Sequence, residues 1–392
     1  MSQNSTMESN LRTQTAVLPP LPNTQHSLLF TVRASSVRTT FVQCPRKHWY
    51  IPTSDTFQKL HPFALANQNV RILEINRRGY KPTTQYNQHG DDDGELRDLN
   101  GENGVDGYRE FWHRRALEIA NLLLKLIQVK NLPEINTETK TDGVVLMGWS
   151  MGTDTLFGFL GQTDAPGIIE KYEALKTHLR GAIMYGTHSY LLTHSDAKSD
   201  VDSTFFYHAP PVPSTDLHQF ALFVSGYYSH TGSDLSSSDV TSTLQTDPPP
   251  SIYNMSNEVQ DHDALVLTEF PMHHENILPI LIEQRTKSLF EPHAASTILP
   301  DIFVVLIGCG KSPLGCVRGR LGVEKEYSEC IREGRKGREI RFITIDDGNH
   351  FVSSRRLVLL QLWLMDRWKV HWDKPEVFWE NLLDAMRLNG SK

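Results

Sequence analysis

The stretch VVLMGWSMGTDTLFGFL, residues 144–160, decides the fold. Residues 144–147 have the length and composition of a buried strand, and residues 153–160 are typical of a helix. Between them, GWSMG at residues 148–152 is a G-x-S-x-G pattern, which joins a strand to a helix through a sharp turn. Such a turn strains the backbone at its centre, so the residues two before and two after must lack side chains. We therefore predict that Ser150 stands exposed at the carboxyl end of the strand.

A serine in this position is a candidate nucleophile. It would lie above the N-terminus of the following helix, where free N–H groups and the helix dipole favour a developing negative charge. The N–H of Met151 is the candidate for one oxyanion donor. The sequence therefore predicts acyl-transfer chemistry at Ser150.

A serine hydroxyl needs a general base, and in this chain order the base follows the last strand. Residues 342–345 read as such a strand, and DDGNHF at residues 346–351 follows it. Of the 17 histidines, only His350 has this setting. We predict that His350 takes the proton from Ser150.

The third member of a triad has no clear candidate. An Asp or Glu is expected just after the penultimate strand, but residues 308–313 read GCGKSP there. Glu324 and Glu326 lie farther along the chain, while Asp346 and Asp347 are too close to His350 in sequence to orient it. The acid therefore stays unassigned.

Outside the motif, apolar runs of strand type alternate with segments of helical periodicity. The expected helices cover residues 56–67, 108–129 and 153–160, and the expected strands cover residues 27–31, 70–75, 144–147, 179–185, 302–307 and 340–345. This alternation predicts an α/β fold in which a mostly parallel sheet has helices on both faces.

Polar and Pro-rich stretches divide the chain. Residues 1–25 read as a disordered tail, and residues 26–189 as the first part of a core. Residues 190–285, rich in Ser, Asp and Pro, suit an inserted cap, and residues 286–392 complete the core. Aromatic residues of the cap favour an apolar or aromatic acyl group: Phe205, Phe206, Tyr207, Phe220, Phe223, Tyr227 and Tyr228.

The composition excludes several classes of protein. The chain has 392 residues, 39% of them hydrophobic, with a net charge of −7 and scattered basic residues, which argues against nucleic acid as a partner. The four cysteines lack C-x-x-C spacing, and the acidic residues 91–95 read as a solvated loop rather than a metal site. Neither a signal peptide nor a membrane span is evident, so we expect a cytoplasmic protein.

The stretch RILEINRRGY, residues 71–80, together with GWSMG and GNHF, resembles the α/β-hydrolase family of the AB-hydrolase-1 type. The similarity is greatest to uncharacterised fungal members and covers residues 26–386. It implies an eight-stranded sheet with a cap after the sixth strand, and hydrolysis of an ester, amide or thioester in a small-molecule acyl substrate. It implies no metal and no organic cofactor. Members that open epoxides or carbon–halogen bonds carry Asp at the elbow, so Ser150 argues against those reactions.

The chain departs from the family pattern at two places. The family's His-Gly pair after the third strand, which supplies a second oxyanion N–H, is displaced by residues 32–47. Trp49 then stands where Gly is expected and is the candidate for this second oxyanion donor. Similarly, residues 352–369 separate GNHF from its usual continuation. We interpret both segments either as unspliced introns in a predicted gene product or as insertions at the rim of the site.

These departures keep a second hypothesis open. The unassigned acid and the altered His-Gly loop favour a hydrolase-like protein without catalysis, which serves as a binding protein or is a mis-spliced product. An acid within hydrogen-bonding reach of His350 would favour the enzyme.

Overall fold

The computed structural model describes most of the core of the chain. The described residues are 39–44, 55–66, 70–75, 104–150, 152–163, 165, 167–187, 222–232, 235, 240–254, 277–351 and 375–386.

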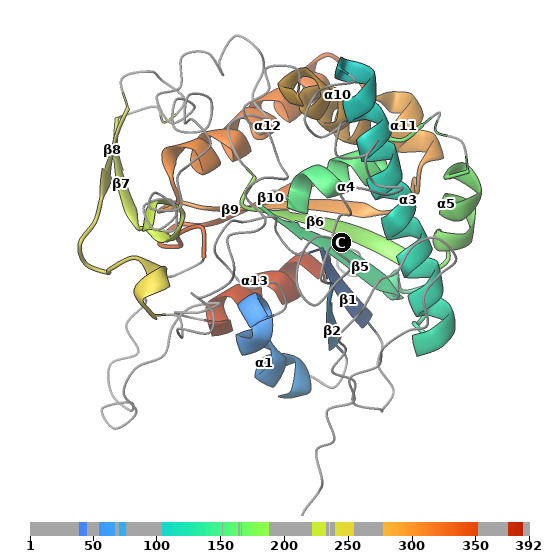
Figure 1. The fold of residues 1–392 in the computed structure, drawn as a ribbon, viewed down its shortest axis with the longest axis horizontal. Coiled ribbons are helices and arrows are strands. Elements are labelled where there is room, and N and C mark those ends of the chain that lie inside the picture. The colour runs from blue at the N-terminus through green and yellow to red at the C-terminus, as the bar shows by residue number, and fades with distance from the viewer. Residues whose placement is uncertain are drawn as a thin grey trace, which may run out of the picture.

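A six-stranded sheet forms the centre of the molecule (Figure 1). Its order is β10-β9-β6-β5-β1-β2, and all neighbouring strands are parallel. The strands are β1 (Thr39–Cys44), β2 (Val70–Glu74), β5 (Val144–Trp149), β6 (Leu179–Tyr185), β9 (Phe303–Cys309) and β10 (Ile340–Ile345). The predicted fold class, an α/β fold around a parallel sheet, is confirmed.

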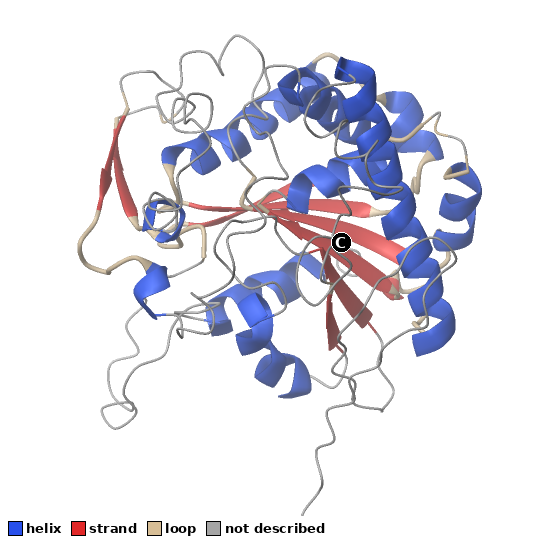
Figure 2. Ribbon diagram, viewed as in Figure 1, coloured by secondary structure: helices blue, strands red, loops and turns tan. Residues whose placement is uncertain are grey.

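Helices cover both faces of this sheet (Figure 2). One face carries α3 (Gly104–Lys130), α4 (Gly152–Leu160), α5 (Ile169–Leu175), α10 (Ile277–Phe290), α11 (Pro292–Thr297) and α12 (Leu314–Arg332). The other carries η1 (Asp55–Leu60), α1 (His61–Ala66) and α13 (Pro375–Met386). Strands covered on both sides must be apolar on both sides, which explains why every residue of β5, β6 and β9 is buried.

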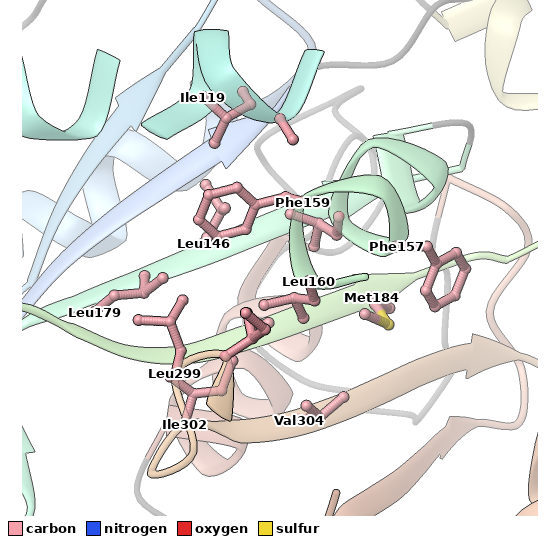
Figure 3. Packing of buried hydrophobic residues seen from close by; sticks show 14 of the residues in the cluster. Ile119, Leu146, Phe157, Phe159, Leu160, Leu179, Met184, Leu299, Ile302 and Val304 are labelled. Atoms are coloured by element: carbon pink, nitrogen blue, oxygen red, sulfur yellow. The ribbon is translucent and has the colours of Figure 1, made fainter. Parts of the chain in front are cut away.

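Successive residues of the central strands belong to opposite halves of the core. Val144 and Leu146 pack with the helices of the first face, whereas Val145 and Met147 pack with those of the second. Figure 3 shows α4 side chains, among them Phe157, over Leu146 and the neighbouring strands. The strand of the elbow is thus fixed from both sides, which holds its carboxyl end in place.

The strand beside β2 differs from the prediction. Residues 27–31, predicted as a strand, lie outside the described residues, and the structure instead places β1 at Thr39–Cys44. This strand pairs with β2 on one side and β5 on the other. The segment 32–47 therefore contributes an interior strand of the sheet, and this part of it is not an insertion at the rim. The segment 352–369 lies outside the described residues.

Part of the range predicted as a cap is described. It contains the antiparallel hairpin of β7 (Tyr228–Thr231) and β8 (Thr241–Leu244), followed by η3 (Ser251–Asn254). In Figure 1 the hairpin lies at the left, on the side of the sheet where β9 is labelled and away from α3 and α5. A second small hairpin joins β3 (Ile135–Asn136) to β4 (Thr141–Asp142).

Two features are absent from the described residues: a membrane-spanning helix and a metal-binding cluster. None of their helices combines the length and the apolar character that crossing a membrane requires. Nor do they contain a group of three or more His, Cys, Asp and Glu side chains arranged to hold a metal ion.

Candidate active site

The turn at Ser150 has the geometry of a nucleophile elbow. β5 ends at Trp149 and α4 begins at Gly152, so the chain reverses within two residues. Ser150 has a φ of 54°, in the left-handed region that a residue with a side chain rarely occupies. Its N–H donates to the carbonyl oxygen of Tyr185 at 2.7 Å, and its own carbonyl accepts from the Thr153 N–H at 2.9 Å. The strained backbone at Ser150 is therefore held from both neighbouring elements. The residue is only 4% exposed, so the prediction that Ser150 stands exposed is wrong: it is buried at the carboxyl end of β5.

The glycine two residues before Ser150 is required by this turn. A Cβ atom added to Gly148 would lie 2.4 Å from the carbonyl oxygen of Gly152, which is backbone and has no freedom to move aside. The close approach of the two glycines allows β5 to pass directly into α4. The reason for glycine that the sequence pattern predicted is thus confirmed at Gly148.

His350 lies beside the elbow, in the loop that follows β10. Its carbonyl oxygen accepts two hydrogen bonds, one from the Trp149 indole at 3.2 Å and one from the Tyr185 hydroxyl at 3.0 Å. Its ring lies over Gly186, because a Cβ at that residue would be 2.9 Å from the ring atom Cε1. Trp149, the residue before Ser150, and Tyr185, whose carbonyl oxygen accepts the Ser150 N–H, therefore also hold the backbone of His350.

Asn349 fixes the same loop from the opposite direction. The side chain is fully buried, and its Nδ2 donates to the Ser225 carbonyl at 2.8 Å and to the Ser251 hydroxyl at 2.9 Å. Its Oδ1 accepts from the N–H of Phe351 at 2.8 Å. One amide thus connects the loop of His350 to two segments that follow β6 in the chain.

The predicted oxyanion donors lie outside the described residues. Neither the N–H of Met151 nor Trp49 can be placed. The N-terminus of α4 does begin two residues after Ser150, so the helix dipole points its positive end toward the elbow.

The carboxylates considered from the sequence are engaged elsewhere or exposed. Glu324 forms an ion pair with Arg320 at 2.7 Å, and Glu326 pairs with Arg285. Asp346 and Asp347 are exposed in the loop after β10. The structure therefore gives none of these four the role of orienting His350.

A thiol contacts His350 at the place where an acid was expected. The loop after β9 packs against the His350 loop, with the Lys311 N–H donating to the Gly348 carbonyl at 2.6 Å. This contact brings the start of α12 to the imidazole, and Cys316 Sγ lies 3.4 Å from His350 Nδ1. Sequence reasoning missed Cys316 because it looked only for carboxylates, although this residue does follow the penultimate strand.

A second thiol lies close by but differs in its surroundings. Cys309, the last residue of β9, is buried, and burial raises the pKa of its thiol far above the usual range. Together with Cys330 these are the cysteines within the described part of the chain whose side chains are placed, and all three are thiols rather than disulfides. A thiol as strongly desolvated as Cys309 is chemically inert at neutral pH.

Comparisons with known proteins give structural similarity without sequence similarity. No family model matches the chain, and no curated protein matches it either. A lipase in its open form is 12% identical, with 92% of this chain and 93% of that chain covered and a TM-score of 0.44. A thermophilic esterase from Thermogutta terrifontis is 11% identical, with 91% and 92% covered and a TM-score of 0.40. A bromoperoxidase from Bacillus anthracis is 12% identical, with 81% and 86% covered and a TM-score of 0.36.

Proposed function

We propose that the chain is a serine hydrolase that cleaves a carboxylic ester, amide or thioester through an acyl-enzyme on Ser150, with His350 as general base. The observation that carries this proposal is the strained φ of 54° at Ser150, in a turn between a strand and a helix N-terminus. Backbone strain of this kind costs of order 1–3 kcal/mol and persists where the surrounding structure imposes it, most often at active sites.

The position of His350 supports the same function. His350 is 1% exposed, and its imidazole lies against Gly186. Gly186 follows Tyr185, and the carbonyl oxygen of Tyr185 accepts the N–H of Ser150. This arrangement supports a pairing of Ser150 with His350 at the carboxyl edge of the sheet. Parallel α/β sheets bind their ligands at this edge.

The chemistry that follows requires only these groups and water. His350 takes the proton of Ser150 Oγ as that oxygen attacks the acyl carbon, and the carbonyl oxygen becomes an oxyanion beside the N-terminus of α4. The leaving alcohol, amine or thiol departs with the proton from the imidazole. Water then attacks the acyl-serine while His350 takes its proton, and the proton returns to Ser150 Oγ as the carboxylic acid leaves.

A fluorophosphonate probe tests the assignment, because it forms a covalent bond with an activated serine and needs no knowledge of the substrate. We expect the folded protein to be labelled, and Ser150→Ala and His350→Gln to lose the label. Ser288→Ala is the matched control, because Ser288 is also fully buried but lies in α10, where its hydroxyl donates to the Arg285 carbonyl. This variant should be labelled like the unmodified protein.

Two results would contradict the proposal. Persistent labelling of Ser150→Ala would move the nucleophile to another residue. No labelling of a protein shown by its circular dichroism and melting transition to be folded would favour a binding protein without catalysis. If labelling is found, a series of aryl esters of increasing acyl length would identify the acyl group that the enzyme prefers.

A further inference from the structure

The contact between Cys316 and His350 has a feature that a carboxylate would not have. A thiol can exchange its role in the hydrogen bond, because it donates when protonated and accepts when ionised. Cys316 is 6% exposed, and its sulfur lies 3.4 Å from Nδ1 of the imidazole. Which of the two atoms carries the proton then decides the tautomer of His350.

Only one of these tautomers can act as a base toward Ser150. If the thiol donates to Nδ1, the neutral ring carries its proton on Nε2, the atom that has to accept the serine proton. If a thiolate accepts from Nδ1–H, Nε2 is free, and the negative sulfur stabilises the imidazolium that forms during the reaction. A thiol in this place therefore connects the ionisation of Cys316 to the catalytic competence of His350.

The position of Cys316 at a helix start favours the thiolate, whereas its burial opposes ionisation. The residue is third in α12, where the first-turn N–H groups and the helix dipole stabilise a negative charge. The contacts printed for the described residues place the imidazole of His350 against the Cys316 sulfur, and Cys309, whose thiol pKa is influenced by Cys316, lies nearby at the end of β9. Farther along α12, Arg318 donates to the Leu235 carbonyl and Arg320 is paired with Glu324.

We propose that Cys316 is a positioning residue that takes the place of the triad acid, and that His350 becomes a competent base when the Cys316–His350 pair retains a single proton, held on Nδ1 between the ring and the thiolate. The proposal rests on the serine-hydrolase function of the same site. It predicts an enzyme whose activity rises at alkaline pH, because an unperturbed thiol ionises near pH 8.5, well above a carboxyl group at about 4.

The ionisation can be measured without any catalysis. The ultraviolet absorbance of thiolate is followed during a pH titration of the folded protein and of Cys316→Ser. We expect one thiolate to titrate near or below pH 8.5 in the unmodified protein and to be missing in Cys316→Ser. Cys330→Ala is the matched control, because Cys330 is a buried thiol of the same helix, about 21 Å from Cys316 along the axis, and its loss should leave that titration unchanged.

The consequence for catalysis is read from the rate of fluorophosphonate labelling as a function of pH. In Cys316→Asp the carboxylate is ionised throughout, so the rising limb should move to the pKa of a histidine near 6.5–7, and labelling at pH 7 should be about tenfold faster than in the unmodified protein. Aspartate is also favourable in the first turn of a helix, so this variant is expected to fold. Cys316→Ser, which cannot ionise, should lose the alkaline rise.

The outcomes separate this proposal from the proposed function. Equal pH profiles of labelling in the unmodified protein, Cys316→Ser and Cys316→Asp would overturn the role of Cys316 while leaving Ser150 as the nucleophile. Absence of a thiolate that disappears in Cys316→Ser would overturn it independently. Loss of labelling in all proteins, with the thiolate titration still present, would refute the hydrolase instead.

Discussion

The loop after β5 and the loop after β9 meet at the same edge of the sheet, but they define their key residues in different ways. At the first loop, backbone geometry alone places Ser150: a left-handed φ, a close approach of Gly148 to Gly152 and the start of α4. After the second loop, at the start of α12, a side-chain contact between residues 34 positions apart in sequence places Cys316 against His350.

This difference explains why Ser150 could be found from the sequence and Cys316 could not. A requirement of the backbone leaves a pattern of glycines around the functional residue, and this pattern can be read along the chain. A requirement for a hydrogen-bond acceptor can be met by several side chains at several positions. The partner of His350 is therefore defined by three-dimensional distance and not by spacing.

The comparison predicts that the elbow is the more fragile of the two regions. Replacing Gly148 by Ala should cost about 3 kcal/mol or more of unfolding free energy, because the new Cβ would lie 2.4 Å from a backbone oxygen. Urea unfolding or the yield of soluble protein measures the effect. Gly167→Ala is the control, since Gly167 has a φ of 74° but no atom within 4 Å of the new Cβ, and its backbone strain should cost about 1 kcal/mol. A Gly148 variant no less stable than this control would contradict the steric explanation.

A smaller effect is expected where side chains hold the base. Asn349→Ala removes three hydrogen bonds of a fully buried amide and should lower the unfolding free energy by about 2–4 kcal/mol. It should also slow the labelling of Ser150, because the loop of His350 loses its anchor. Asn381→Ala serves as the control, since the amide of Asn381 donates a single hydrogen bond to Val377 within α13. The role of Asn349 is refuted if both variants lose the same stability.

The smallest effect is expected at the His350 carbonyl. Tyr185→Phe removes the hydroxyl that donates to this oxygen at 3.0 Å, but the Trp149 indole still donates to it. We expect a loss of about 1 kcal/mol in stability and of less than about tenfold in labelling rate. Tyr228→Phe removes a comparable hydrogen bond, to the Phe223 carbonyl, and should leave the labelling rate unchanged. Equal labelling rates of the two variants would show that Tyr185 does not position the base.

Much of the sheet could be predicted because its central strands are buried on both faces, and because the edge strand β10, although partly exposed, is rich in β-branched and aromatic residues. The predicted strands at residues 179–185 and 340–345 coincide with β6 and β10, and the helix predicted at 108–129 is α3, Gly104–Lys130. Continuous apolar runs and a long 3.6-residue period are the strongest signals that a sequence contains.

The strand β1 was missed because it has no continuous apolar run. Its sequence, TTFVQC, mixes polar and apolar residues, whereas residues 27–31 form the more apolar run nearby. Hydrophobicity favoured residues 27–31, which lie outside the described residues, whereas the pairing of Thr39–Cys44 with β2 and β5 depends on partners that are distant in sequence. The same limitation applies to Cys316, whose contact with His350 also depends on distant residues.

The buried amide of Asn349 also has a thermodynamic consequence. It joins the base's loop to Ser225 and Ser251, two residues from the part of the chain that follows β6. In the proposed hydrolase, a substrate that bound more tightly to one arrangement of these two serines would shift the equilibrium position of His350, and by reciprocity the state of His350 would change the affinity for that substrate by the same factor. Substrate affinity and the basicity of the imidazole would then be linked through one amide side chain.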